Sequence, residues 1–268
     1  MSRFGVITRN GIVRSFIEGS QANLYDPDAQ AFFTAASITD NTQKSAVNTL
    51  VLSLKSANIW SKMKALYPVV GGVASAHAVN LKQPGTYNLT FATGWTHAST
   101  GMTPSNSYAN TALNQNPILN QNSWSMSVYL RTNIQLNAIF GASETGVQTA
   151  LYPYQPSNTW AFDDFNSTGT LISDSTTNSL GFYQGVRQTS SVVKMIKNTA
   201  IASKTSNSSG RNAIPFFYGA VNFNGTAVGF SSRQIAFGSI GDGLTDVEAT
   251  NFYTAVQTFQ TTLNRQVP

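Results

Sequence analysis

The sequence predicts a mainly β fold, an antiparallel β-sandwich with two helices in front of it and one helix behind it. Residues 73 to 241 carry apolar runs with a period of two, separated by polar or glycine-bearing turns, which is typical of a sandwich. Residues 245 to 263 carry apolar residues at helical spacing instead. With 268 residues, the chain is long enough to bury a substantial core.

Residues 1–25 are expected to form a hairpin arm. Asn10-Gly11, a strong signal for a two-residue turn, lies between the apolar-bearing runs 4–7 and 12–17. A lone hairpin buries little and is marginally stable in water. We therefore expect the arm to pack on its own domain or on a partner, and to serve assembly.

Residues 26–70 are expected to form a helical segment. Asp26-Pro27 supplies an N-cap followed by a proline at the first helical position. A second, longer helix follows and should end before Pro68 and the Gly71-Gly72 pair. The apolar positions that define the two helices are Ala29, Phe32, Phe33, Ala36, Val47, Leu50, Val51, Leu54 and Ala57.

Residues 71–243 are expected to form the sandwich, with no α-helix between 73 and 241. The polar stretch from Gly94 to Asn122 is too long for a simple hairpin loop, so it predicts an excursion over one face. Candidate strands cover residues 124–131, 137–142, 148–154, 160–165, 180–187, 192–197, 216–221 and 233–240. The predicted core includes Trp124, Met126, Val128, Phe140 and Phe237.

Residues 244–268 are expected to form a C-terminal helix packed on the sandwich. Thr245 and Glu248 have the spacing of a capping box, and Leu244 is placed as the apolar staple in front of it. The face toward the sandwich is predicted to carry Phe252, Val256, Phe259 and Leu263.

Three segments carry a resemblance to a known family. They are S-L-G-F-Y-Q-G-V-R-Q-T-S-S-V-V-K-M-I-K-N-T-A-I-A-S-K-T, I-P-F-F-Y-G-A-V-N-F-N-G-T-A and R-Q-I-A-F-G-S-I-G-D-G-L-T-D. In this order they resemble the closing strands of laminin-G-like or concanavalin A-like jelly rolls of bacteriophage tail, spike and other virion proteins. Lys197-Asn198-Thr199 lacks the glycine usual in the family's turn, which predicts a wider turn here.

The resemblance extends to the N-terminal half. D-P-D-A-Q-A-F-F-T-A-A-S-I-T-D and I-W-S-K-M-K-A-L-Y-P-V-V-G-G resemble the helical segment that precedes such domains in phage structural proteins. The resemblance covers residues 26–267 and implies a concanavalin A-like jelly roll in a virion protein. Jelly rolls host unrelated activities, so it transfers no site.

The resemblance implies a bacteriophage virion structural protein, a spike, fibre or decoration component, located in the virion and presenting a lectin-like domain for host-surface attachment. Two alternatives stay open, a purely structural component that binds only other virion proteins, and a polysaccharide hydrolase. Expected partners are other virion proteins and a host-surface glycan. A homo-oligomer is expected because linked weak sites gain avidity, and analogy suggests a trimer.

The carboxylates argue against an enzyme. Glycosidases need two carboxyl groups flanking the scissile bond, and Glu18, Glu144 and Glu248 lie in no E-x-D-x-E arrangement. Asp163 and Asp164 are consecutive in a predicted strand, so their side chains should face opposite sides of the sheet. We therefore expect a protein without enzymatic activity.

Composition excludes further classes. Charged residues make up 10% of the chain against roughly 25% in an average soluble domain, so Ser, Thr, Asn and Gln must solvate most of the surface. The net charge of +5 is spread without a basic run, so no nucleic-acid partner is expected. Cysteine is absent, and His77 and His97 are isolated, so neither a metal site nor a cofactor is expected. No apolar run approaches the roughly 18 residues that span a membrane.

One group of residues is a candidate ligand site. Aromatic faces accept the apolar side of a sugar, and carboxylates bind its hydroxyls. The candidate residues are Tyr152, Tyr154, Trp160, Asp163 and Asp164, with Tyr154 and Trp160 as a stacking platform. The alternative is a structural role, since Trp160 and Phe162 share one strand face and at least one of them should lie in the core.

Overall fold

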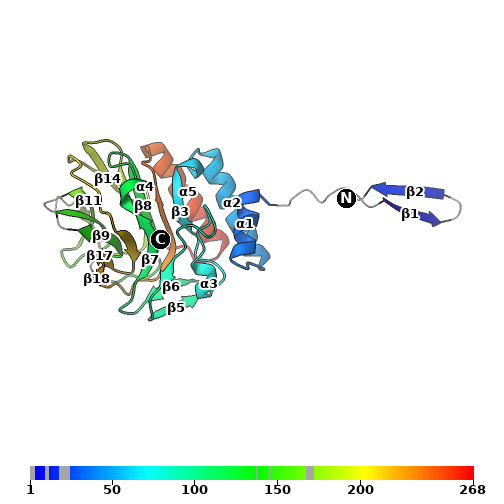
Figure 1. Ribbon diagram of the computed structural model, residues 1–268, viewed down its shortest axis with the longest axis horizontal. Coiled ribbons are helices and arrows are strands. Elements are labelled where there is room, and N and C mark those ends of the chain that lie inside the picture. Colours follow the sequence, from blue (N-terminus) through cyan, green and yellow to red (C-terminus); the bar gives the residue numbers. More distant parts are fainter. Residues whose placement is uncertain (1–3, 10–11, 18–24, 137, 145, 167–171) are drawn as a thin grey trace.

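The computed structural model describes the chain except for residues 1–3, 10–11, 18–24, 137, 145 and 167–171. The described part is mainly β, with two sheets stacked as a jelly-roll sandwich and a layer of helices on one of them (Figure 1). The predicted fold class is therefore confirmed. Every described strand pair is antiparallel except the pair of β17 with β9.

The eight-stranded sheet is the middle layer, with the order β15-β14-β13-β8-β19-β6-β5 and with β3 also paired to β19. Its strands are β3 (Met63–Tyr67), β5 (Trp95–Ala98), β6 (Gly101–Pro104), β8 (Trp124–Leu130), β13 (Gly181–Arg187), β14 (Val192–Lys197), β15 (Ala200–Thr205) and β19 (Ile235–Gly241).

The nine-stranded sheet is the outer layer, with the order β12-β11-β10-β9-β16-β7-β4 and with the β17–β18 hairpin joined to β9. Its strands are β4 (Thr90–Phe91), β7 (Ala109–Asn114), β9 (Phe140–Glu144), β10 (Val147–Tyr152), β11 (Thr159–Asn166), β12 (Ile172–Ser175), β16 (Pro215–Tyr218), β17 (Val221–Phe223) and β18 (Thr226–Val228).

The helices α1 (Pro27–Ala35), α2 (Asn41–Ser56) and α5 (Asp246–Thr262) cover the face of the eight-stranded sheet that points away from the other sheet. The chain also forms the short helices α3 (Ala74–His77) and α4 (Gln115–Ile118) and a 3-10 turn η1 at Trp60–Lys62, and α4 follows β7 of the nine-stranded sheet. α1, α2 and α5 share one apolar cluster with sheet residues such as Phe182 and Phe237. A second cluster fills the space between the sheets and includes Trp124, Met126, Val128 and Phe140. The five predicted core residues are all fully buried.

The helix signals in the sequence are confirmed. The Asp26 side chain accepts a hydrogen bond from the Asp28 backbone N–H, and Pro27 is the first helical residue. Thr245 and Glu248 form the capping box of α5, in which each side chain accepts a bond from the other residue's backbone N–H. Phe259, on the inner face of α5, is 2% exposed.

Residues 26–70 were predicted to form a helical segment, but this prediction is only partly correct. Met63–Tyr67 forms the strand β3, which pairs with β19. The sandwich therefore begins before residue 71. β3 is buried at four of its five positions, so it lacks the alternation of polar and apolar residues by which strands were found. The α2 helix ends at Ser56, before Pro68 as predicted.

The prediction of an excursion from Gly94 to Asn122 is wrong, because this stretch supplies β5, β6 and β7, which pair within the two sheets. In β7 the buried positions are Ala109, Thr111 and Leu113, and two of these side chains are small, so the alternation is weak. The short helices α3 and α4 also contradict the prediction of no helix there. Four residues are too few to show a helical period.

The turn after Lys197 is tight, not wider as predicted. Lys197 pairs with Ala200, so only Asn198 and Thr199 form the turn. Asn198 has a φ of 54°, a conformation that asparagine tolerates better than most side chains. Its Oδ1 also accepts a hydrogen bond of 2.8 Å from the Phe182 backbone N–H. Asparagine thus replaces the glycine of the resembled turn.

The two strands of the predicted N-terminal hairpin are present. β1 (Phe4–Arg9) and β2 (Ile12–Ile17) pair antiparallel as a two-stranded sheet, with Arg9 opposite Ile12. That register leaves two residues for the turn, as Asn10-Gly11 predicts. The turn itself lies outside the described residues.

Candidate functional site

The outer face of the nine-stranded sheet lies on the side of the molecule away from the helices. Figure 1 shows β9, β11 and β17 at one end of the body and α1 and α2 at the other. The strand register places one residue of each of four strands in a row across this face, namely Val221, Gly141, Ala150 and Asp163. We call these four residues the outer row.

The middle of the outer row has almost no side chain. A Cβ added to Gly141 would lie 2.7 Å from the Thr149 carbonyl oxygen and 2.8 Å from the Ala150 Cβ, so only glycine fits there. Ala138, Ala150 and Val221 form a small apolar cluster against which Tyr152 packs. The middle of this face is therefore lined by small, uncharged residues, and we call this part the floor. The larger side chain of Tyr152 packs against it.

A polar network borders the floor. The Gln148 amide nitrogen Nε2 donates to Tyr152 Oη at 2.8 Å and to Asp163 Oδ2 at 2.9 Å. Gln148 and Tyr152 lie on the same side of β10 because they are four residues apart in a strand. Asp163 Oδ1 also accepts a bond from the Asp164 backbone N–H at 3.0 Å. An amide, a phenol and a carboxyl group thus meet on one face.

Burial sets the charge of this network. Asp163 is 1% exposed, and loss of hydration raises the pKa of its carboxyl group to about 6. Burial, with the nearby Asp163 charge, also raises the pKa of Tyr152. The phenol therefore stays neutral at neutral pH, where it can both donate and accept hydrogen bonds.

Asp164 faces the opposite side of β11 and lies between the sheets. Its Oδ1 accepts a hydrogen bond of 2.8 Å from Trp124 Nε1, and its Oδ2 pairs with Arg187 Nε. Burial raises the pKa of Asp164 to about 6, although the Arg187 guanidinium and the Trp124 indole favour the charged carboxylate. As predicted, Asp163 and Asp164 point to opposite faces and form no catalytic pair.

The structure does not bring Tyr154 and Trp160 together as a platform. Trp160 is 2% exposed and its ring meets Tyr183 edge to face, with centroids 5.9 Å apart. Tyr154 is half-exposed, and its Oη lies 3.3 Å from Asn158 Oδ1. Trp160 and Phe162 are both core residues, as the structural alternative predicts. A ligand role for Tyr152, Tyr154 and Asp163 stays a prediction.

An exposed aromatic ring that sequence reasoning missed lies on the same face. Phe223 is 48% exposed and pairs with Ser143, which in turn pairs with Gln148. Adjacent strands are about 4.8 Å apart, so Phe223 and Gln148 are about 10 Å apart across the sheet. The sequence signal that could have revealed this hairpin is Asn224-Gly225. These two residues form the turn between β17 and β18, with φ values of 48° and 90°.

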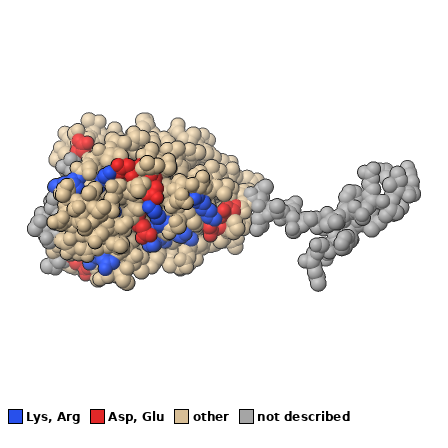
Figure 2. All heavy atoms as spheres, turned by 90° about the horizontal axis from the view of Figure 1, so that it is seen from above, with Lys and Arg blue, Asp and Glu red and all other residues tan. Residues whose placement is uncertain are grey.

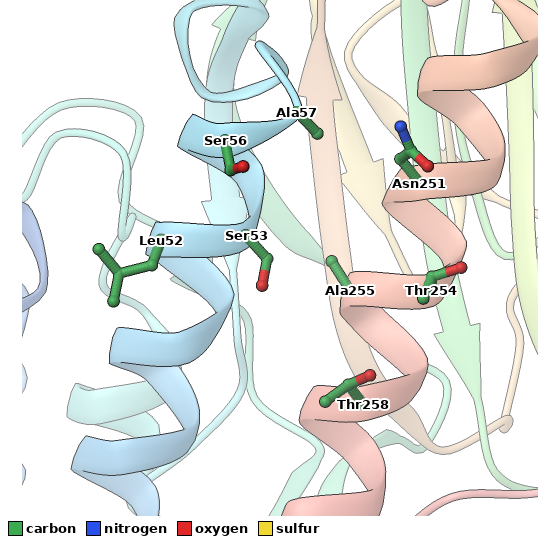
Figure 3. A pocket seen from close by; sticks show the side chains of 8 residues that line it. All are labelled: Leu52, Ser53, Ser56, Ala57, Asn251, Thr254, Ala255 and Thr258. Atoms are coloured by element: carbon green, nitrogen blue, oxygen red, sulfur yellow. The ribbon is translucent and has the colours of Figure 1, made fainter.

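Two surface grooves of the described part of the chain carry no unpaired charged side chain. One, of about 550 Å³, lies between α2 and α5 (Figure 3) and is lined by Leu52, Ser53, Ser56, Ala57, Asn251, Thr254, Ala255 and Thr258. It holds no titratable side chain. The other, also about 550 Å³, lies at the start of α5. Its charged residues Lys62 and Asp246 are paired with Glu248 and Lys194.

Charge and metal-ligand patterns give no further site in the described part of the chain. Figure 2 shows a face on which a few acidic and basic side chains are interspersed among many uncharged ones. No group of three or more His, Cys, Asp or Glu side chains is placed to hold a metal ion among the described residues. Among the helices that the structure describes, none is long and apolar enough to cross a membrane.

Comparison with known proteins bears on the fold. No protein-family model and no curated protein matches this chain. A mutant of Trypanosoma rangeli sialidase displaying trans-sialidase activity is similar with a TM-score of 0.56 and 8% identity, over 80% of this chain and 39% of that chain. The botulinum neurotoxin serotype D binding domain is similar with a TM-score of 0.53 and 11% identity, over 75% of this chain and 52% of that chain. These likenesses show a β-sandwich fold shared with parts of larger chains.

Proposed function

We propose that this chain is a bacteriophage virion structural protein, a spike, fibre or decoration component, whose lectin-like sandwich binds a host-surface glycan without cleaving it. The observation that carries the glycan proposal is the outer face of β17, β9, β10 and β11. There the Gln148, Tyr152 and Asp163 network lies on the same sheet face as the exposed ring of Phe223.

This face has the two kinds of group that a sugar needs. Hydroxyl groups can exchange hydrogen bonds with the half-buried Tyr152 phenol and the Gln148 amide. The apolar side of a sugar ring can lie against an aromatic face, which Phe223 offers.

The carboxylates support binding without catalysis. Glycoside hydrolysis needs two carboxyl groups on either side of one bond, and Asp163 and Asp164 lie on opposite faces of β11. Glu248 caps α5 and pairs with Lys62. Glu144 accepts a bond from the Ala213 backbone N–H. A polysaccharide hydrolase is therefore the weakest of the three proposals.

A purely structural virion component is the second candidate. The apolar side chains of Phe223, Val228 and Phe230 are 48%, 40% and 37% exposed, and exposed apolar groups also suit contact with another protein. In either case we propose a virion location, other virion proteins as partners, and a homo-oligomer, by analogy a trimer. Residues 1–25 would serve assembly.

A glycan array and host-cell binding test the proposal. The purified full chain is expected to bind a defined set of bacterial surface glycans, and Gln148→Ala is expected to weaken binding about fivefold, because one lost hydrogen bond is worth about 1 kcal/mol. Gln83→Ala, at an exposed position away from this face, is the matched control. Equal binding by both variants contradicts the site. Failure of the wild type to bind any glycan or cell favours the structural candidate, and release of reducing ends favours the hydrolase.

A further inference from the structure

The chain has two histidines, and they form a pair. His77 ends the short helix α3 and His97 lies in β5, yet their Nδ1 atoms are 2.9 Å apart. The prediction that the two are isolated is therefore wrong. His77 is 1% exposed, whereas His97 is half-exposed. Protons from solvent thus have easier access to His97.

The shared hydrogen bond limits the protons that the pair can hold. One Nδ1 must carry a proton and the other must be bare. The remaining nitrogen of the buried ring, His77 Nε2, has no hydrogen-bond partner among the described residues. When His97 is protonated, its Nδ1–H must donate, so the His77 proton must sit on Nε2, where it meets no acceptor. When both rings are protonated, both Nδ1 atoms carry hydrogen and the bond is lost.

The surroundings add to the cost of each proton. The charged group facing His77 from the segment after α5 is the guanidinium of Arg265, which is itself 1% exposed. Its hydrogen bonds go to neutral oxygens, those of Pro68, Val69, Ser99, Ala236 and Gln260. From β4 and β5, the uncharged rings of Phe91 and Trp95 pack on His97. No carboxylate is among these contacts to offset a positive charge.

The same causes move both pKa values downward. Burial, the neighbouring His97 and Arg265 lower the pKa of His77 to about 3. Burial also lowers the pKa of His97. Because loss of hydration penalises the charged form of histidine, the pair is neutral at neutral pH and begins to be protonated only in acid.

The hydrogen bond between His77 and His97 connects the edge strand β5 to the helix α3. β5 is the last strand of the eight-stranded sheet and pairs only with β6 in the described part of the chain. β6 in turn pairs with β19 through one residue pair, Met102 with Ile235. The β5–β6 hairpin is thus held weakly by its ladder. We propose that the His77–His97 bond is an acid-sensitive latch, whose protonation frees the β5–β6 hairpin from α3.

Two measurements on the full chain test the latch. Imidazole ¹⁵N NMR can follow both rings separately, because the chain has only two histidines. On acidification, the His77 proton is expected to move to Nε2 in step with protonation of His97. Hydrogen exchange, corrected for its intrinsic pH dependence, is expected to rise about tenfold per pH unit in residues 95–104 below the His97 pKa, but not in β8.

His97→Gln provides the matched variant, because its amide can donate to His77 Nδ1 but does not titrate. Its exchange in residues 95–104 is expected to stay constant with pH. The same acid-induced rise in His97→Gln, or no local rise in the wild type, overturns the latch. If the variant fails to fold, NMR of the wild type still tests the latch. A His77 tautomer that does not change when His97 is protonated also overturns the proposal.

Discussion

The indole of Trp124 donates a hydrogen bond of 2.8 Å to the carboxylate of Asp164 across the interior of the sandwich. Trp124 belongs to β8 of the middle sheet and Asp164 to β11 of the outer sheet. Arg187, also in the middle sheet, pairs with the other oxygen of the same carboxylate. A single acidic side chain therefore binds two partners on the facing sheet and fixes how the two sheets are aligned.

Asp164→Asn is expected to destabilise the protein by about 3 to 5 kcal/mol, because it leaves the buried Arg187 charge without its partner. Chemical denaturation at neutral pH measures the loss. Asp174→Asn is the control, since Asp174 is exposed and its bond among the described residues is a local one from the Ser175 N–H. Equal stability of the two variants would show that the buried pair contributes little.

Asp163→Asn is expected to change how stability depends on pH. The folded-state pKa of about 6 lies above the ordinary value of 3.8, so the folded protein binds the proton more tightly than the unfolded chain. The Asp163 contribution is thus most favourable below about pH 4 and is lost as pH rises through 6. Relative to the wild type, the variant should gain about 3 kcal/mol between pH 3.5 and pH 7. Parallel stability curves from urea unfolding would refute this.

Phe259→Ala is expected to cost about 3 to 5 kcal/mol, because the ring is buried between α5 and the sheet against Phe237. Val247→Ala in the same helix is the control. Val247 is 70% exposed, and its loss should change stability by less than about 0.5 kcal/mol. Thermal or urea unfolding distinguishes the two, and a small effect of Phe259→Ala would mean that α5 packs with another face.

Trp160→Ala and Phe223→Ala are expected to have opposite effects. Trp160 lies in the core, so its loss should cost about 3 to 5 kcal/mol of stability. Phe223 is exposed, so its loss should leave stability nearly unchanged but weaken glycan binding about fivefold, as expected for one stacking contact of about 1 kcal/mol. Ile201→Ala, an exposed apolar position of the other sheet, controls for general surface effects. Unaltered glycan binding by Phe223→Ala removes this ring from the site.

The sequence predicted the elements whose signals are local. Eight candidate strands, the helix caps and the inner face of α5 all follow from spacing within a short stretch. β3, β6 and β7 were missed because a strand buried on both faces, or one with small inward side chains, shows little alternation. Their pairing depends on residues far away in the sequence.

The candidate site was predicted only in part for a similar reason. The strand period indicates that Asp163 and Asp164 face opposite sides, but it does not say which side is the interior. Trp160 therefore remained ambiguous until its contact with Tyr183 was known. Gln148 and Phe223 join the face through the register of β10, β9 and β17. A residue pattern within one strand does not determine that register.

The contacts of Arg265 affect the order in which the chain can fold. Its guanidinium donates to the carbonyl of Pro68, 197 residues earlier in the sequence, and β19 pairs with β3 over a similar separation. The helices and β3 therefore cannot complete their packing until synthesis has reached Arg265. Contacts of such long range slow folding, and apolar surface exposed in the meantime invites aggregation. Newly made chains should depend on chaperones more than a fold with local contacts does.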